Sequence, residues 1–203
     1  MKTFPFVAFF LALSALPQIA LSQEECATIK DDSARLSCFD ISFGTKKVTT
    51  TTLNDNGKWR ISVDSSALTD EKSVFLQLDS NDNIRAKFGA VGPATLLLRC
   101  MENTTAAIFR FNDHHMADLQ SYGVIEYRLD KEQMSKIRTQ ESTDNKALGL
   151  WSGAKAIPFA KSLLGHETLI LRATPFGESP IISTFDIRGI DSAITELRET
   201  CNW

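Results

Sequence analysis

The sequence contains no closely spaced pair of cysteines and no phosphate-binding loop. Its four cysteines lack the C-x2–4-C spacing typical of zinc sites and form no C-x-x-C redox motif. The segment GAVGP at residues 89–93 is not followed by the Lys-Ser/Thr pair that a phosphate-binding loop requires. We therefore expect no cofactor and no nucleotide-binding site.

An excess of positive charge is also missing. The chain has 22 Lys+Arg against 25 Asp+Glu, for a formal net charge of −3 at pH 7. Proteins that bind nucleic acid or an anionic membrane surface usually carry a basic patch or stripe. The composition therefore argues against a nucleic-acid partner.

Long apolar runs are confined to the N-terminus. Lys2 precedes the apolar residues 4–16, a run shorter than the roughly 20 residues that span a bilayer as a helix. Pro17 ends this run, and Ala20 and Ser22 place small residues at positions −3 and −1 of a cleavage site. These features predict a signal peptide over residues 1–22, removed on export, with no stable membrane insertion afterwards. A membrane anchor is the less favoured alternative.

All four cysteines follow the proposed cleavage site: Cys26, Cys38, Cys100 and Cys201. An even number in an exported chain predicts two disulfides, although four cysteines allow three pairings. Proximity favours Cys26 with Cys38, which leaves Cys100 with Cys201. Closure of the second, long loop stabilises a fold by about 4–5 kcal/mol through chain entropy.

The first disulfide constrains the segment around it. One continuous helix would separate Cys26 and Cys38 by roughly 18 Å, at about 1.5 Å per residue, whereas disulfides tolerate Cα separations of about 4.4–6.8 Å. We therefore expect a disulfide-stapled helical hairpin over residues 23–44. Its turn is expected at residues 30–33, with Asp32 or Ser33 capping a second helix over residues 34–43. Residues 45–57, with threonines at 49–52, are interpreted as a linker.

Residues 58–203 alternate short apolar runs with turn residues. Strands are expected at residues 59–63, 74–78, 94–101, 107–111, 124–129, 168–174 and 181–187, with a turn at 81–83. Helices are expected at residues 154–164 and 191–200. Short strands with regular turn signals favour an antiparallel sandwich or barrel. The expected fold class is mostly β (α+β): an antiparallel β-sandwich-like domain with the N-terminal helical hairpin and two further short helices.

The polar segment DHHMAD at residues 113–118 is the strongest candidate for metal binding. Its histidines, His114 and His115, stand beside two carboxylates, a donor set that transition metals accept. Adjacent side chains of a strand point to opposite faces, however, and the third histidine, His166, is distant in sequence. A solvated loop is the preferred interpretation, and no metal site is expected.

A second candidate is GLWSG at residues 149–153, near the G-x-S-x-G pattern of serine hydrolases. Its serine, Ser152, stands one position too late. A serine hydrolase with His114 or His166 as base is therefore disfavoured, and no catalytic residue is expected.

The predicted N-terminal hairpin carries a possible partner surface. Arg35, Phe39, Asp40 and Phe43 lie on the segment that the first disulfide closes. Arg35 and Asp40 can form a local ion pair, and exposed phenylalanines can dock a partner. Packing of this face against the strands is the favoured alternative.

Short motifs run in order through nearly the whole chain after residue 22. They are C-x2-I-x-D-x3-R-L-x-C-F-D at 26–40, Trp59, LTD at 68–70, LLLRC at 96–100, YRLD at 127–130, EST at 141–143, FDIRG at 185–189 and CNW at 201–203. Together they resemble the VasI/TagO family of periplasmic proteins associated with type VI secretion. The resemblance implies an exported accessory protein of the periplasm and brings no catalytic residues.

Three functions are consistent with these features. The favoured one is a non-enzymatic adaptor or assembly factor that binds a protein component of a secretion or envelope complex. The second is a periplasmic ligand-binding module or inhibitor, which needs a concave pocket or an exposed aromatic patch. The third is a cell-wall-active hydrolase, which needs a histidine to meet a carboxylate or serine in a cleft.

Overall fold

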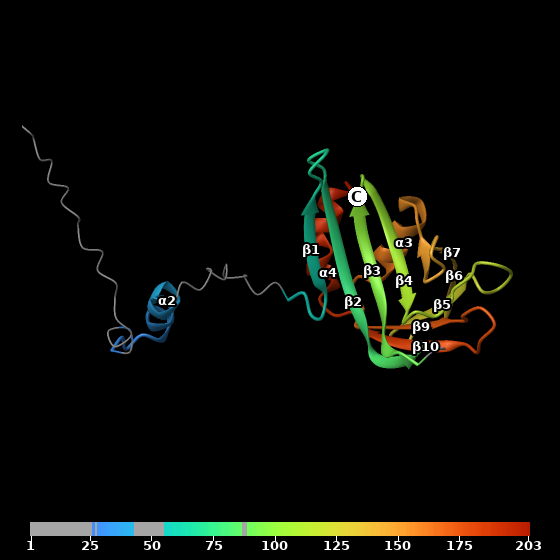
Figure 1. Ribbon diagram of the computed structural model, residues 1–203, viewed down its shortest axis with the longest axis horizontal. Helices are drawn as coiled ribbons and strands as arrows, with labels where there is room; N and C mark the ends of the chain where they lie inside the picture. The colour runs from blue at the N-terminus through green and yellow to red at the C-terminus, as the bar shows by residue number, and fades with distance from the viewer. Residues whose placement is uncertain (1–25, 27, 43–54, 87–88) are drawn as a thin grey trace, which may run out of the picture. The chain divides into compact units, whose positions relative to one another are not determined.

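The computed structural model describes residues 26, 28–42, 55–86 and 89–203, which belong to two compact units, residues 1–52 and 53–203. The described part of the first unit contains α2 (Asp32–Ser42) and the disulfide Cys26–Cys38, with a Cα separation of 5.5 Å (Figure 1). Most of the first arm of the expected hairpin, and the expected helix end at residues 43–44, lie outside the described residues.

Helix α2 begins at Asp32, two residues earlier than expected. The Asp31 carboxylate accepts a hydrogen bond from the amide of Ala34 at 2.8 Å, so Asp31 is the capping residue and the expectation of Asp32 or Ser33 was wrong. An N-capping side chain accepts a hydrogen bond from the amide two or three positions ahead, and here it is the Asp31 carboxylate that accepts the amide of Ala34. Asp32 is free to pair with Arg35 instead.

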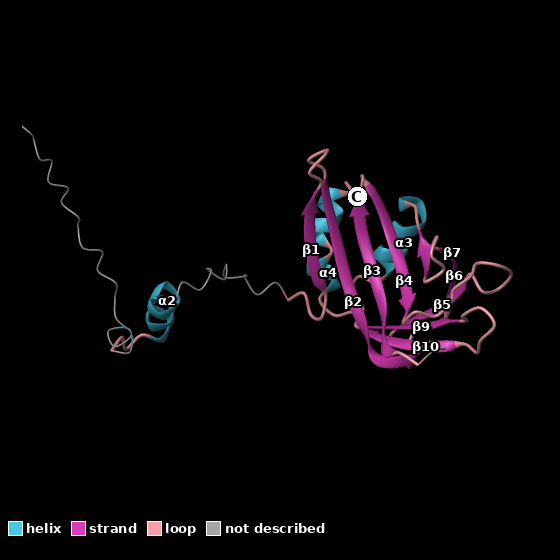
Figure 2. Cartoon of the chain, in the orientation of Figure 1, coloured by secondary structure: helices cyan, strands magenta, loops and turns pink. Residues whose placement is uncertain are grey.

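The second unit is built from two antiparallel sheets (Figure 2), which confirms the mostly β expectation. The first sheet has the order β1 (Arg60–Ser65), β2 (Lys72–Arg85), β3 (Val91–Met101), β4 (Thr104–Phe111), β8 (Ala147–Leu150) and β7 (Gln140–Glu141). The second has the order β10 (Ile181–Asp186), β9 (Thr168–Ala173), β5 (Val124–Leu129) and β6 (Ser135–Arg138). In Figure 1, β9 and β10 run across the direction of β2–β4.

One hydrophobic core draws side chains from both sheets. Leu96, Leu98 and Cys100 alternate along β3 with half-buried neighbours and have no exposed surface. Ile125 of β5 and Phe185 of β10 enter the same core from the second sheet. Because successive side chains of a strand point to opposite faces, this alternation of apolar residues places one face of each sheet in the interior.

Strand β2 is long because the turn expected at residues 81–83 is a bulge within the strand. Its register against β3 shifts between Asp79 and Asn83. At the bulge, the Ser80 hydroxyl accepts the amide of Ala94 at 2.9 Å, and the Asp82 carboxylate accepts the amide of Thr184 at 3.1 Å. Asn and Asp side chains that bond to nearby backbone can form a bulge as well as a turn. The bulge thus attaches β2 to β10.

The described residues of the second unit form three short helices: α3 (Gly153–Ser162), α4 (Ile190–Ala193) and α5 (Thr195–Thr200). The single helix expected over 191–200 is therefore divided at Ile194, whose backbone has ψ −11°. Asp, Ser and Thr, which surround this position, are weak helix formers. Ile194 itself is fully buried, so packing sets its position.

The second disulfide, Cys100–Cys201, joins β3 to the end of α5. Its Cα atoms are 5.8 Å apart, and both cysteines are buried. The pairing is the one that sequence proximity favoured.

Two glycines bring distant backbone segments into direct contact. Gly57 and Gly189 have φ of 54° and 84°, in the left-handed region. A Cβ at Gly57 would lie 2.1 Å from the carbonyl oxygen of Arg188, and one at Gly189 would lie 2.3 Å from the carbonyl carbon of Asn56. Residues 55–57 therefore pack against residues 188–189 only because neither glycine carries a side chain.

We expect Gly189→Ala to destabilise the protein by about 2 kcal/mol more than Gly177→Ala does. Both residues have positive φ, which costs an alanine about 1–2 kcal/mol, but only Gly189 has backbone within 4 Å of the added Cβ. Urea unfolding of the two variants measures the difference. If both variants lose the same free energy of unfolding, the contact between residues 55–57 and 188–189 does not contribute to stability.

Candidate functional site

The three histidines have different partners. His114 is 3% exposed, and its Nδ1 lies 3.2 Å from a carboxylate oxygen of Glu178. The ring of exposed His115 lies edge-on to Phe176, with centroids 5.8 Å apart. His166 Nδ1 lies 2.8 Å from Asp130 in another loop. Within the described part of the chain, no group of three or more His, Cys, Asp or Glu side chains is arranged to hold a metal ion.

The two histidine–carboxylate pairs connect loops. Asp130 accepts the amides of Glu167 and Thr168 at 3.1 and 2.8 Å as well as facing His166. The hydrogen bond from His166 lowers the pKa of Asp130, and the two amides act in the same direction. Glu178 likewise joins the loop after β9 to the loop after β4 through His114. Each pair therefore positions a loop.

An exposed apolar surface, here called the loop patch, lies on these ordered loops. It consists of His115, Tyr122 and Phe176, whose rings are neighbours, and of Leu119, whose carbonyl accepts the amide of Tyr122. The ring of Phe176 lies 5.3 Å from that of Tyr122, and the amide of Phe176 donates to the carbonyl of His115 at 2.9 Å. Leu119 is 62% exposed and Phe176 is 45% exposed. The patch thus presents aromatic and aliphatic side chains on the two loops that the His114–Glu178 pair joins.

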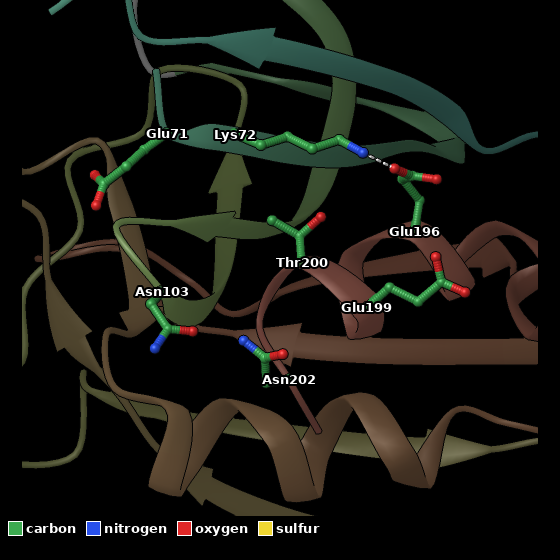
Figure 3. Close-up of a pocket in the computed structure, with 7 residues that line it drawn as sticks. All are labelled: Glu71, Lys72, Asn103, Glu196, Glu199, Thr200 and Asn202. Carbon is green, nitrogen blue, oxygen red and sulfur yellow. Dashed lines mark hydrogen bonds and ion pairs between the residues drawn. The ribbon is translucent and has the colours of Figure 1, made fainter. Parts of the chain in front are cut away.

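A shallow polar hollow of about 440 Å³, here called the acidic hollow, lies beside α5. Figure 3 shows the residues that line this acidic hollow: Glu71, Lys72, Asn103, Glu196, Glu199, Thr200 and Asn202. Lys72 forms an ion pair with Glu196, so the other two carboxylates, Glu71 and Glu199, give the lining a negative balance. Such a hollow suits a basic side chain of a partner.

The Cys100–Cys201 disulfide positions both sides of the acidic hollow. Asn103 follows β3, which carries Cys100, and Asn202 directly follows Cys201. Both asparagines have positive φ, 52° and 54°, a conformation that Asn tolerates better than most residues. The lining comes from the end of the β1–β2 turn and the start of β2, from the β3–β4 turn, from α5 and from the residue after Cys201, so no local motif could have predicted it.

Trp151 and Ser152 belong to the segment GLWSG, whose sequence is near the hydrolase motif G-x-S-x-G. The Trp151 ring covers Gly149, its Nε1 donates to the carbonyl of Gln140 at 3.1 Å, and the Arg99 guanidinium lies 5.9 Å above it. Ser152 precedes α3 without a side-chain cap hydrogen bond. Trp151 therefore packs on its own sheet and does not belong to the loop patch.

The partner surface proposed on α2 is described in part. Arg35 and Phe39 are half-buried, and Arg35 pairs with Asp32. The side chain of Asp40 and all of Phe43 lie outside the described residues.

An ion pair between half-buried Asp186 and exposed Arg188 lies at the end of β10. Asp186 accepts hydrogen bonds from Nε and Nη2 of Arg188 at 2.7 and 2.6 Å, and Lys58 Nζ lies 3.4 Å away. The Arg188 hydrogen bonds lower the pKa of Asp186 to about 2, against the opposing effect of burial. The same carboxylate raises the pKa of Arg188.

We expect Asp186→Asn to weaken the dependence of stability on pH between 4 and 2. Since the folded-state pKa of about 2 lies below the ordinary value of 3.8, the ionised carboxylate stabilises the fold fully above about pH 4. That contribution is lost as the pH falls through 2. Urea unfolding at pH 7, 4, 3 and 2.5 should show a less stable variant at pH 7 with a shallower loss on acidification. Asp70→Asn, in the exposed β1–β2 turn, is the control, and unchanged steepness in Asp186→Asn would contradict the assignment.

No helix in the described part of the chain has both the length and the apolar character to cross a bilayer. The architecture is that of a disulfide-containing, mostly β protein with the open acidic hollow and the exposed loop patch.

By its sequence, the chain belongs to the VasI family of the type VI secretion system (VasI, EvfG), whose model matches residues 25–203. No curated protein matches the sequence.

Among solved structures, the chain is similar to invasion associated protein B from Bartonella henselae. The two share 12% sequence identity with a TM-score of 0.47, over 73% of this chain and 96% of that chain.

Proposed function

We propose that this protein acts in the periplasm as a non-enzymatic adaptor or assembly factor of a type VI secretion system, and that it binds a protein component of the secretion or envelope complex. The observation that carries the proposal is the family match over residues 25–203. The two disulfides and the signal-peptide pattern at residues 1–22 support export to an oxidising compartment.

The loop patch supports binding of a protein. Exposed aromatic and aliphatic side chains that are held on fixed loops lose little conformational entropy when a partner covers them. His114, at 3% exposure, is closed to a substrate, and the Asp130 carboxylate that faces His166 is also engaged by two backbone amides. These positions favour a structural role for both histidines over the hydrolase alternative.

Site-specific photo-crosslinking in intact cells tests the proposal. A photoreactive phenylalanine analogue is placed at position 176 in the loop patch, at position 36 on α2, and at position 182 as a control. Leu36 is 64% exposed and Ile182 is 58% exposed, so reactivity is not limited by burial at either position. We expect position 176 to capture a secretion-system subunit that position 182 does not capture, with position 36 reporting on the α2 surface.

Two other outcomes contradict the adaptor role. Capture of no secretion component at either 176 or 36 would reject it. Recovery of only wall fragments or a small ligand would favour the hydrolase or the ligand-binding module. Cell fractionation and non-reducing peptide mapping of the same sample test the periplasmic location and the disulfide pairs.

A further inference from the structure

Strand β1 has the longest open edge among the strands that the structure describes. It ends the six-stranded sheet, and no described strand pairs with its outer side (Figure 1). The other sheet edges are shorter or occupied. Strands β7 and β6 have two and four residues, and the edge of β10 receives the Asp82 carboxylate through the amide of Thr184.

The side chains of β1 do not protect this edge. Ile61 and Val63 are in register with the buried residues Leu76 and Val74, so they lie on the core side of the sheet. They nevertheless remain 37% and 45% exposed. Natural edge strands usually carry an inward charge, a proline or a bulge that prevents pairing, whereas β1 presents two β-branched apolar residues.

The backbone groups at this edge can be assigned from the ladder. The amide of Ser66 donates to the carbonyl of Glu71 at 2.9 Å, at the turn that closes the β1–β2 pair. Hydrogen-bonded and non-hydrogen-bonded pairs alternate along an antiparallel ladder. Residues 60, 62 and 64 therefore bond to β2, and the amides and carbonyls of Ile61 and Val63 point to the open edge.

We propose that β1 pairs with β1 of a second copy of this chain, antiparallel, with the two-fold axis at Ser62. In this register Ile61 of one copy faces Val63 of the other, and these are the residues whose backbone groups are available. Arg60 faces Asp64 of the second copy, twice by symmetry. An isologous contact of this kind joins two six-stranded sheets into one continuous sheet.

The register is selected by charge. Centring the axis on Ile61 places Arg60 opposite Ser62, and centring it on Val63 places Asp64 opposite Ser62, so both ion pairs are lost. A shift by one residue instead turns the apolar residues to the other face. Arg60 bonds to Asp79 of its own chain at 2.8 Å through Nη2, and a guanidinium has further N–H donors for a second carboxylate. Small Ser62 suits the close, non-hydrogen-bonded pair at the axis.

Charge exchange across the axis tests the proposal. Sedimentation equilibrium of the full exported chain should show a monomer–dimer equilibrium. Arg60→Glu and Asp64→Lys should each raise the dimer dissociation constant at least tenfold, because like charges then face each other. An equimolar mixture of the two variants should restore the dimer. In the mixed dimer, the new glutamate faces the new lysine, and Arg60 of one chain faces Asp64 of the other.

The controls separate this interface from others and from unfolding. Glu102→Lys, in the exposed β3–β4 turn, makes the same charge change as Asp64→Lys and should leave dimerisation unchanged. Val63→Pro removes an open-edge amide without removing a β2 hydrogen bond and should abolish the dimer, which keeps the test possible if Arg60→Glu fails to fold. A wild-type monomer at all concentrations, or dimerisation unchanged in Asp64→Lys and Val63→Pro, would overturn the proposal. Crosslinking from position 176 is a separate readout, so either proposal can fail alone.

Discussion

Replacing both Cys100 and Cys201 by serine is expected to destabilise the second unit by about 4–5 kcal/mol. The disulfide closes a loop with a sequence separation of 101. When a loop of about 100 residues is opened, the unfolded chain gains conformational entropy equivalent to about 4.7 kcal/mol. Because a domain of this size is stabilised by roughly 5–15 kcal/mol in total, the change removes a large part of the margin. Thermal and urea unfolding of the double variant measures the loss.

The matched control is the double replacement of Cys26 and Cys38. Its loop has a sequence separation of only 12, and the bond lies in the first unit, which has its own contacts. We expect loosening of that unit and little change in the melting of the second. Reduction of the wild-type protein should reproduce the larger loss, which covers the case in which the variant does not fold. Equal losses in both double variants would contradict this division.

The parts of the fold that follow local rules could be predicted from the sequence. The apolar run at residues 94–101 predicted a buried strand, and the structure places β3 there, with buried and half-buried residues alternating from Ala94 to Met101. The disulfide pairing followed from proximity alone. In contrast, β6, β7 and β8 contain only four, two and four residues. Residues 147–150 of β8 are all buried, so they show no alternation to detect.

The candidate surfaces could not be predicted because they depend on tertiary contacts. The loop patch joins Tyr122 to Phe176, residues that the second sheet brings together from distant segments. The segment around His114 was correctly interpreted as a loop, but the burial of its ring against Glu178 has no sequence signal. The self-complementary pattern of β1 is local, yet it acquires meaning only once β1 is known to lie at an edge.

Helix α3 offers the second large effect: Phe159→Ala is expected to destabilise the protein by about 3–5 kcal/mol, the range for buried phenylalanines. Phe159 is 4% exposed. Its ring meets Phe109 of β4 edge-on, with centroids 5.3 Å apart, and Tyr127 of β5 at 5.6 Å. One side chain thus contacts both sheets, so its loss leaves a cavity where they meet.

The helix itself cannot compensate for that loss. Pro158 lies inside α3, and Ser152 provides no side-chain cap, so the helix depends on packing for its stability. Urea unfolding should show that Phe159→Leu retains most of the stability, because it keeps much of the volume, whereas Phe176→Ala, at an exposed ring, costs less than about 1 kcal/mol. Trp151 lies two residues before the start of α3, so its fluorescence reports whether the helix detaches before the sheets unfold. If Phe159→Ala lowers the free energy of unfolding no more than Phe176→Ala does, the prediction is contradicted. The two sheets would then be held together without α3, chiefly by Asp82 and the shared core.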